Sequence, residues 1–338
     1  MENRNFISGT NKSVGILGTG SYLPEKVLTN FDLQKMVDTS DEWITKRTGI
    51  SERRIIEEGR PYYEMGAIAA EKALKDAGLT ASDIDLIIVT TNTPDYLVPC
   101  TASMIQNAIH ADKAATFDLN AACSGYVYGL TVAAQFILTG FYKYVLLIGC
   151  EALSRITDWE DRASCILFGD GAGATILGPV EKGYGLLEIY LGSDGSLGHY
   201  ITAPCTLIRD IDIEKRHHEN KRVLWLDGNE VFKFAVKIME TATLAVLEKA
   251  GMSIEDVNMI IPHQANIRII ESSIKRLGIS SEKVYTNLHK YGNISSASIP
   301  VALDEALKEK KIKKDDIVVF VGFGGGLTWG SAVFKWNK

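Results

Sequence analysis

Three polar residues from distant parts of the chain have side chains suited to nucleophilic catalysis. Cys123 stands in the stretch DLNAACSGYVYGL, His263 in PHQAN and Asn293 in YGNISSAS. A cysteine thiolate attacks carbonyl carbon readily, and a nearby histidine or asparagine can donate hydrogen bonds to the reacting groups. We therefore ask which elements would bring these three residues together.

The segment around Cys123 has the pattern of a strand that leads into a buried helix. Residues 115–119 (ATFDL) form a short strand pattern, and apolar residues continue almost all round a helical projection from Ala121 onward. Asn120 is suited to cap the helix, which would place Cys123 in its first turn, where the helix dipole favours a thiolate. The alternative is that Cys123 is only a small apolar residue in a buried helix.

An internal repeat relates the two halves of the chain. AGLTASDIDLII from Ala77 matches AGMSIEDVNMII from Ala250, an offset of 173 residues that also carries VLLIG at Val145 onto VVFVG at Val318. The same offset places Cys123 on Ser296. We interpret the chain as two βαβ-rich halves, residues 1–182 and 183–338, packed about a pseudo-two-fold axis.

This duplication predicts where the polar residues meet. The turns around Cys123 and Asn293 would approach one another at the axis, and His263 ends the apolar strand 258–261 at the carboxyl edge of a sheet. A lone histidine after an apolar strand is usually structural, but its predicted place beside Cys123 and Asn293 favours a catalytic role.

Two glycine-containing stretches resemble phosphate-binding loops but lack their essential residues. GTGSYLP at 18–24 lacks the third glycine of a dinucleotide-binding loop, and Pro24 would block the helix, so a tight turn is expected. FGDGAGA at 168–174 is not followed by a Lys-Ser/Thr pair and indicates close packing in a sheet. In FGGGL at 323–327, by contrast, free N–H groups could face an oxyanion; glycine flexibility at a hairpin is the alternative.

Composition excludes several classes of protein. A net charge of −6 without an aromatic and basic stretch argues against nucleic acid as a partner. No stretch is apolar enough for a signal peptide or a membrane span. The five cysteines are scattered without CxxC or metal-ligand spacing, so we expect no metal site and reduced thiols in the cytoplasm. The polar stretch 194–221, which includes His217 and His218, is expected to be a surface loop.

Seven separated motifs together resemble one enzyme family. They are DEWITKRTGI, DLNAACSG, FGDGAGA, NEVFKFAV, PHQANIRII, KYGNISSASIPVALDEAL and FGGGLTWGSA, and they span the chain from about Val14 to its end. The family is β-ketoacyl-acyl-carrier-protein synthase III, which starts dissociated fatty acid synthesis. The resemblance implies an α/β fold of the thiolase-like type, with five layers in the order α-β-α-β-α, and a homodimer.

The resemblance also assigns roles to individual residues. It makes Cys123 the acylated nucleophile, His263 and Asn293 its catalytic partners, and Gly325 with the Cys123 amide the oxyanion hole. The expected coenzyme A contacts are Trp43, Arg47, Arg162 and Asn266. Trp43 and Arg47 are four residues apart in a predicted helix and share a face, although a surface pair of this kind need not bind a ligand.

The implied reaction is a decarboxylating Claisen condensation. An acyl-CoA would acylate Cys123, and malonyl-acyl carrier protein would lose CO2 and attack the acyl group, with no cofactor beyond the coenzyme A of the substrate. The alternatives are a related condensing enzyme of specialised metabolism, a hydroxymethylglutaryl-CoA synthase-like enzyme and a non-catalytic acyl-CoA-binding module. Asparagine at 293, without an obvious added carboxylate, argues against the hydroxymethylglutaryl-CoA synthase.

A local cluster of cations could bind the acidic carrier protein. Arg268, Lys275 and Arg276 lie on the helix predicted after His263, and Lys233 is a possible neighbour. Arg268 and Lys275 are seven residues apart and share a face, so we expect a docking patch near the site. Solvated surface lysines are the alternative.

Overall fold

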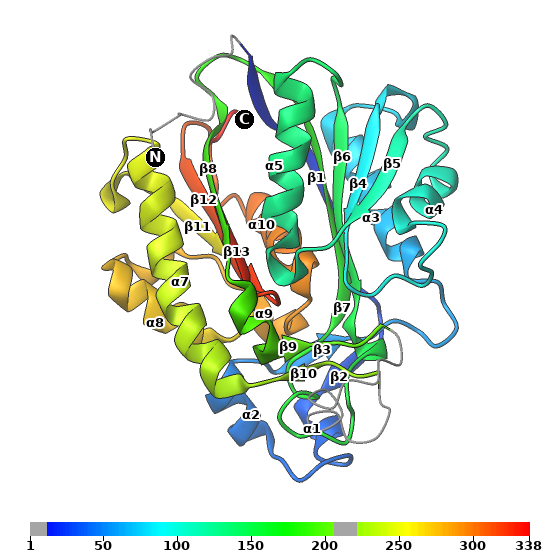
Figure 1. Ribbon diagram of the computed structural model, residues 1–338, viewed down its shortest axis with the longest axis vertical. Coiled ribbons are helices and arrows are strands. Elements are labelled where there is room, and N and C mark those ends of the chain that lie inside the picture. The colour runs from blue at the N-terminus through cyan, green and yellow to red at the C-terminus, as the bar shows by residue number, and fades with distance from the viewer. Residues whose placement is uncertain (1–11, 206–221) are drawn as a thin grey trace.

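Two large sheets and three layers of helices form the body of the computed structural model, which describes residues 12–205 and 222–338 (Figure 1). The first sheet has the strand order β1-β7-β6-β4-β5, and the second has the order β8-β13-β12-β11. Strands at corresponding positions in the two sheets also correspond in the repeat. For example, the 173-residue offset carries the inner strand β6 (Val145–Ala152) onto the inner strand β12 (Ile317–Gly324). The structure therefore confirms the predicted duplication.

Parallel pairing gives each sheet an edge at which strand ends gather. In the first sheet β4 (Leu86–Thr90) pairs in parallel with β5 (Ala115–Leu119) and with β6. In the second sheet β11 (Met259–Pro262) pairs in parallel with β12. The antiparallel strands are β1 (Ser13–Tyr22), β7 (Asp170–Val180), β8 (Gly185–Ser193) and β13 (Thr328–Lys335). The predicted boundary between the halves falls in the turn that joins β7 to β8.

The helices form an outer layer on each side and one shared layer in the middle. Helices α3 (Tyr63–Ala77) and α4 (Thr101–Ala108) cover the outer face of the first sheet, and α7 (Gly228–Lys249) and α8 (Ile267–Leu277) cover that of the second. Helices α5 (Gly125–Leu138) and α10 (Ser298–Lys308) lie between the sheets, in one apolar cluster with residues of both. This is the predicted α-β-α-β-α arrangement.

Shorter elements gather at the end of the molecule where the parallel strands finish (Figure 1). These elements are β2 (Val27–Thr29), α1 (Asn30–Leu33), α2 (Asp41–Thr48), β3 (Glu52–Arg54), β9 (Ile201–Thr202), β10 (Trp225–Leu226) and α9 (Leu288–Tyr291). Helix α2 is the one predicted around Trp43, and it begins at a Ser40 side chain that accepts the Trp43 N–H.

The prediction of a tight turn at GTGSYLP was wrong, because strand β1 continues through this stretch to Tyr22. Its glycines serve a close approach of α3 instead. A Cβ atom at Gly18 or Gly20 would lie 2.4 Å from Ala73 O or 2.3 Å from Ala69 O. The glycines thus allow the helix backbone to lie directly on the strand.

Within residues 12–205 and 222–338 no helix is long and apolar enough to cross a membrane. In the same ranges there is no group of three or more histidine, cysteine or acidic side chains that could bind a metal ion. All five cysteines are free. Residues 194–205 contain a 3₁₀ helix (Gly195–Tyr200) and β9, whereas His217 and His218 lie outside the described residues.

Candidate active site

Two short turns meet where the central helices begin. The 3₁₀ turn η2 (Ala122–Ser124) leads into α5, and η7 (Ser295–Ala297) leads into α10. Ala122 and Ser295, 173 residues apart, both adopt a left-handed backbone, with φ of 48° and 47°. The two turns contact each other, as predicted, and each carries the same uncommon conformation.

Each turn packs against the central strand of the other half. A Cβ atom added at Gly324 of β12 would lie 2.4 Å from the Cys123 nitrogen, so this strand can pass η2 only because it has glycine there. A Cβ atom at Gly149 of β6 would lie 2.4 Å from Ser296 O in η7. Both glycines are thus required by the crossed packing of the two halves.

Cys123 lies at the wall of a cavity of about 400 Å³ and is partly exposed. The wall is a mixture of backbone, small residues and aliphatic side chains that could accommodate a short acyl group. Its residues are Asn92, Asn120, Ala121, Ala122, Cys123, Leu153, Ile156, Phe168, Ile201, Ala203, Leu224, Ser295, Gly325, Gly326 and Thr328.

The resting state of Cys123 differs from the expected thiolate. Cys123 stands in η2, before α5. The prediction that Asn120 caps the helix was wrong, because the N-caps of η2 and α5 are Ala121 and Ser124; the Asn120 side chain accepts the Ala122 N–H at 3.1 Å. Burial raises the pKa of the Cys123 thiol to about 12, although a hydrogen bond with the Ser295 hydroxyl lowers it. The expectation was wrong because desolvation of the charged sulfur outweighs its place before a helix.

His263 lies next to Cys123 across a glycine of β12. A Cβ atom at Gly322 would lie 3.6 Å from Cys123 O and 3.7 Å from the His263 Cβ. The ring packs edge-on to Phe323, with centroids 5.6 Å apart, and its Nδ1 has no hydrogen-bond partner. Burial, to 1% exposure, lowers the pKa of His263 to about 3, so the imidazole is neutral at physiological pH.

Asn293 is held at the start of the second turn with its amide oriented. Its backbone N–H donates to Leu167 O at 2.8 Å, and its carbonyl accepts the Gly169 N–H at 3.1 Å. The side-chain Oδ1 accepts the Ser295 N–H at 2.8 Å, so Nδ2 is the end of the amide that donates. Asn293 and His263 are both buried beside the cavity rather than in its wall.

Gly325 and Cys123, the residues predicted to form the oxyanion hole, line the same cavity. Gly325 follows the end of β12 and lies in the cavity wall with Cys123. A Cβ atom at Gly325 would lie 3.4 Å from the Ala122 Cβ, which places the glycine against η2. Gly325 and Cys123 therefore lie close together in the cavity wall.

The predicted coenzyme A residues gather around a groove of about 680 Å³. Trp43, Arg47 and Asn266 lie in its wall, and the Arg47 and Arg162 guanidinium carbons lie 4.9 and 5.0 Å from the centre of a Trp43 ring. Asn266 also caps α8 by accepting the Arg268 N–H at 2.9 Å. Leu167 lies in the wall of the groove and Phe168 in the wall of the cavity, so the two hollows are neighbours.

The predicted docking cations do not form one patch of uncompensated charge. Lys233 pairs with Glu230 at 2.6 Å and Arg276 with Glu240 at 2.5 Å. Arg268 is exposed, stacks on Phe232 and lies in the wall of the same groove as Trp43. Lys275 is exposed near the end of α8.

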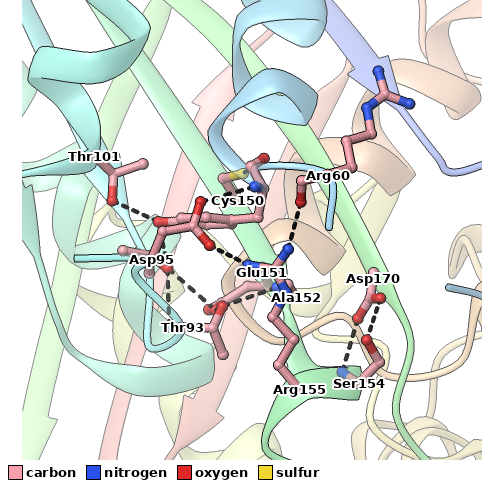
Figure 2. Close-up of polar contacts among 12 residues, drawn as sticks. Arg60, Thr93, Asp95, Thr101, Cys150, Glu151, Ala152, Ser154, Arg155 and Asp170 are labelled. Carbon is pink, nitrogen blue, oxygen red and sulfur yellow. Dashed lines mark hydrogen bonds and ion pairs between the residues drawn. The ribbon is translucent and has the colours of Figure 1, made fainter. Parts of the chain in front are cut away.

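A buried carboxylate network was missed from the sequence. Glu151, at the end of β6, is fully buried and accepts hydrogen bonds from Asn92, Thr93 and Ser296. Figure 2 shows Thr93 next to Glu151 and Ala152, with the separate contacts of Arg155 with Asp95 and of Ser154 with Asp170 nearby. The signal was present, since an acidic residue directly ends the apolar run VLLIGC.

Family comparisons match both halves of the chain. The family described as 3-oxoacyl-[acyl-carrier-protein (ACP)] synthase III matches residues 117–195, and its C-terminal part matches residues 247–336. A beta-ketoacyl-[acyl-carrier-protein] synthase III from Caldanaerobacter subterraneus subsp. tengcongensis is 54% identical over 326 residues. That match covers 96% of this chain and 98% of the relative.

Solved structures agree with these sequence matches. The 3-oxoacyl-[acyl-carrier-protein] synthase III of Aquifex aeolicus is 46% identical, with a TM-score of 0.90 over 96% of this chain and all of that one. The corresponding enzyme of Thermus thermophilus is 45% identical, with a TM-score of 0.91 over 96% and 99% of the two chains.

Proposed function

Because the chain belongs to the 3-oxoacyl-[acyl-carrier-protein] synthase III family, we propose that Cys123 accepts an acyl group from acyl-CoA for condensation with malonyl-acyl carrier protein. The protein is an acyltransferase that starts fatty acid synthesis. The observation that best supports these residue roles is the partly exposed Cys123 in the wall of a cavity, with His263 and Asn293 buried beside it.

In the first half-reaction, the sulfur of Cys123 attacks the thioester carbonyl of the acyl-CoA. The carbonyl oxygen gains negative charge, and the N–H groups of Cys123 and Gly325 stabilise it. Coenzyme A leaves as its thiol, and the acyl group stays on Cys123 within the cavity. This divides the overall reaction into acyl transfer and carbon–carbon bond formation.

In the second half-reaction, malonyl-acyl carrier protein loses CO2 and leaves an enolate. Asn293 donates through Nδ2, because its Oδ1 already accepts the Ser295 N–H. The neutral His263 ring can donate through Nε2–H, since no acceptor lies beside Nδ1 to hold the proton there. The enolate then attacks the acyl-cysteine and releases the β-ketoacyl product.

The groove beside the cavity suits the nucleotide part of coenzyme A. The aromatic face of Trp43 can stack with an adenine ring, and Arg47 and Arg162 supply charge for phosphates. Since Leu167 and Phe168 separate groove and cavity, the thioester arm would cross this segment to reach Cys123. The reaction requires no cofactor besides this substrate.

The partners follow from exposed features of the fold. The edge strand β5 and the exposed Tyr96, Leu97 and Val98 next to it would be covered by a second copy of the chain, which supports a homodimer. Arg268 and Lys275 would contact the acidic carrier protein at the groove. We place the enzyme in the cytoplasm, where five free thiols stay reduced.

The proposal is tested by following the acyl group. Incubation with acetyl-CoA and intact mass measurement should give one acetyl group per chain, mapped by peptide analysis to Cys123. Addition of malonyl-acyl carrier protein should remove it and yield acetoacetyl-acyl carrier protein. A Cys100→Ser variant, changed at a partly buried thiol outside the cavity, should behave like the wild type. Absence of any acetyl adduct on the wild-type protein would contradict the proposal.

A further inference from the structure

The position of Asn293 depends on a short segment of the other half of the chain, residues 167–169. The Asn293 N–H donates to Leu167 O at 2.8 Å, and its carbonyl accepts the Gly169 N–H at 3.1 Å. Phe168 pairs with Asn293 in an isolated parallel β-bridge. A shift of this segment would therefore move the Asn293 amide, and a displacement of about 1 Å in a reacting group can cost about a hundredfold in rate.

Arg53, in β3, holds the residue that precedes this segment. Its Nη2 donates to Ile166 O at 2.7 Å, and its Nη1 donates to Asn30 Oδ1 at 2.9 Å and to Leu28 O at 3.2 Å. Arg53 is 0% exposed, and burial lowers its pKa to about 10, so the guanidinium stays charged at neutral pH. A charged donor binds a carbonyl more strongly than a neutral one does, so Arg53 fixes Ile166 firmly.

The Cβ atom of Arg53 lies next to both partners of the Asn293 pairing. A Cβ atom at Gly169 would lie 3.1 Å from the Arg53 Cβ and 2.3 Å from Tyr291 O. A Cβ atom at Gly292 would lie 3.5 Å from the Arg53 Cβ and 2.6 Å from Leu167 O. Glycines on both segments thus allow the two to meet beside Arg53, and the side chain at position 53 helps to set their spacing.

Arg53 reaches the helix with the predicted coenzyme A residues only through Asn30. The Asn30 Nδ2 donates to Ile50 O at 2.7 Å and to Asp41 Oδ1 at 2.9 Å, at the two ends of α2. These bonds do not include Arg53, so α2 keeps them when Arg53 is changed. A change at Arg53 should therefore act on Asn293 more than on the binding of acyl-CoA.

We propose that Arg53 is a positioning residue for the condensation step, which holds Ile166 and thereby sets the place of the Asn293 amide. Arg53 lies in the wall of neither the cavity nor the groove, so it acts through Asn293 and not on the substrate. This inference rests on the proposed function, and it adds a residue to the second half-reaction alone.

Arg53→Lys tests this role, because lysine keeps the charge but cannot reproduce the planar set of donors. CO2 release from malonyl-acyl carrier protein is measured in the Cys123→Ala background, where acylation plays no part. Its kcat should fall about tenfold, with KM within about twofold of the parent. Acetylation of Cys123 at saturating acetyl-CoA, in protein that retains the cysteine, should stay within about twofold. Arg53→Met, which fills the space without a buried charge, should show the same pattern and serves where the lysine variant does not fold.

A double-mutant cycle with Asn293→Ala separates positioning from a general structural defect. In the background that already lacks the Asn293 amide, Arg53→Lys should lower CO2 release no further, because the group that it positions is absent. A further tenfold loss in that background would show that Arg53 does not act through Asn293 and would overturn the proposal.

Arg54→Lys is the matched control, since Arg54 is the next residue of β3. Its guanidinium pairs with Glu52 at 3.3 Å and lies over the ring of Tyr291, with no hydrogen bond to residues 166–169. It should change neither CO2 release nor acetylation. Equal effects of Arg53→Lys and Arg54→Lys, or equal losses in both half-reactions, would overturn the positioning role. A wild-type protein that accepts no acetyl group would instead contradict the proposed function.

Discussion

The turns η2 and η7 have the same backbone but different surroundings. Cys123 in η2 lies against Gly322 and Gly324 of β12, which add no side chain, and it faces the cavity. Its counterpart Ser296 in η7 is 1% exposed, and its hydroxyl lies 2.7 Å from Thr90 O and 2.8 Å from a carboxyl oxygen of Glu151. The residue that corresponds to Glu151 in the other half is Gly324.

This difference shows how a duplicated scaffold acquires one reactive site rather than two. The left-handed residue and the helix that follows are retained in both turns. What differs is the strand opposite: Gly324 of β12 has no side chain to contact η2, whereas Glu151, its counterpart in β6, binds the Ser296 hydroxyl of η7. We infer that reactivity depends on this opposing strand as much as on the residue in the turn.

The largest expected effect comes from exchanging the two residues. Cys123→Ser should abolish acyl-enzyme formation, since a serine hydroxyl here is barely ionised. The double variant Cys123→Ser with Ser296→Cys should remain without acylation, because position 296 has no access to the cavity. Intact mass after incubation with acetyl-CoA checks both. An acetyl group mapped to position 296 of the double variant would show that the two turns are interchangeable.

The next prediction compares the two asparagines that precede η2 and η7. Asn120 and Asn293 are 173 residues apart and each accepts the N–H two residues on, at 3.1 and 2.8 Å. Asn293→Ala should still be acetylated but should lose condensation by about a hundredfold, the effect of one lost oxyanion donor. Asn120→Ala, at an exposed position, should lose less than about tenfold.

Labelled acetyl incorporation and CO2 release separate the two half-reactions of these variants. His263→Ala should behave like Asn293→Ala, and Cys123→Ala should still release CO2 from malonyl-acyl carrier protein. If Asn293→Ala failed to accept acetyl yet decarboxylated normally, the assignment of roles would be reversed.

A smaller effect concerns acid stability. His263 has an uncharged counterpart in Thr90. The pKa of His263 is about 3 in the folded state, below its unfolded value of 6.5, so protons bind the unfolded chain preferentially as pH falls below 6.5. The free energy of unfolding should therefore decrease by about 2 kcal/mol from this group between pH 6.5 and pH 5.

Urea unfolding of wild type and His263→Gln at the two pH values measures this contribution. The variant should lack that part of the pH dependence, because glutamine does not titrate. An identical decrease in both proteins would assign acid sensitivity to other buried groups.

The smallest effect distinguishes the outer helices. Helix α8 carries Arg268, Lys275 and Arg276, whereas α4 has no charged residue. Lys275→Glu should raise KM for malonyl-acyl carrier protein by about three- to tenfold and leave acetylation by acetyl-CoA unchanged, with a smaller effect at high salt. Arg268→Glu should affect both reactions, since Arg268 lies in the wall of the groove.

Lys313→Glu is the control for these charge reversals. Lys313 is exposed and precedes β12, at the end of the strand opposite Gly324. It should not change either KM. An equal effect of Lys275→Glu on carrier protein and acetyl-CoA would argue against docking on α8.

The sequence predicted the features that depend on periodicity and repetition. The offset from Ala77 to Ala250 located the duplication, and the four-residue spacing of Trp43 and Arg47 located α2. The prediction from sequence failed where tertiary packing determines the local structure. GTGSYLP has the composition of a turn, but the approach of α3 requires glycines in a continuous strand.

The protonation state of Cys123 also could not be predicted from local sequence patterns. A helix start predicts a thiolate at Cys123, but the desolvation that raises its pKa comes from both halves of the fold. Glu151 was missed because it belongs to no local motif, and its hydrogen bond with Ser296 exists only where β6 meets η7.

The crossed packing of the turns has a consequence for how the chain folds. Since η2 rests on β12 and η7 on β6, and since α5 and α10 share one apolar cluster with both sheets, neither half can bury its inner face alone. The two halves should therefore unfold in a single cooperative transition although each is one copy of the repeat. Residues 1–182 produced as a fragment would expose the apolar side of a whole sheet and should aggregate unless residues 183–338 are supplied during refolding.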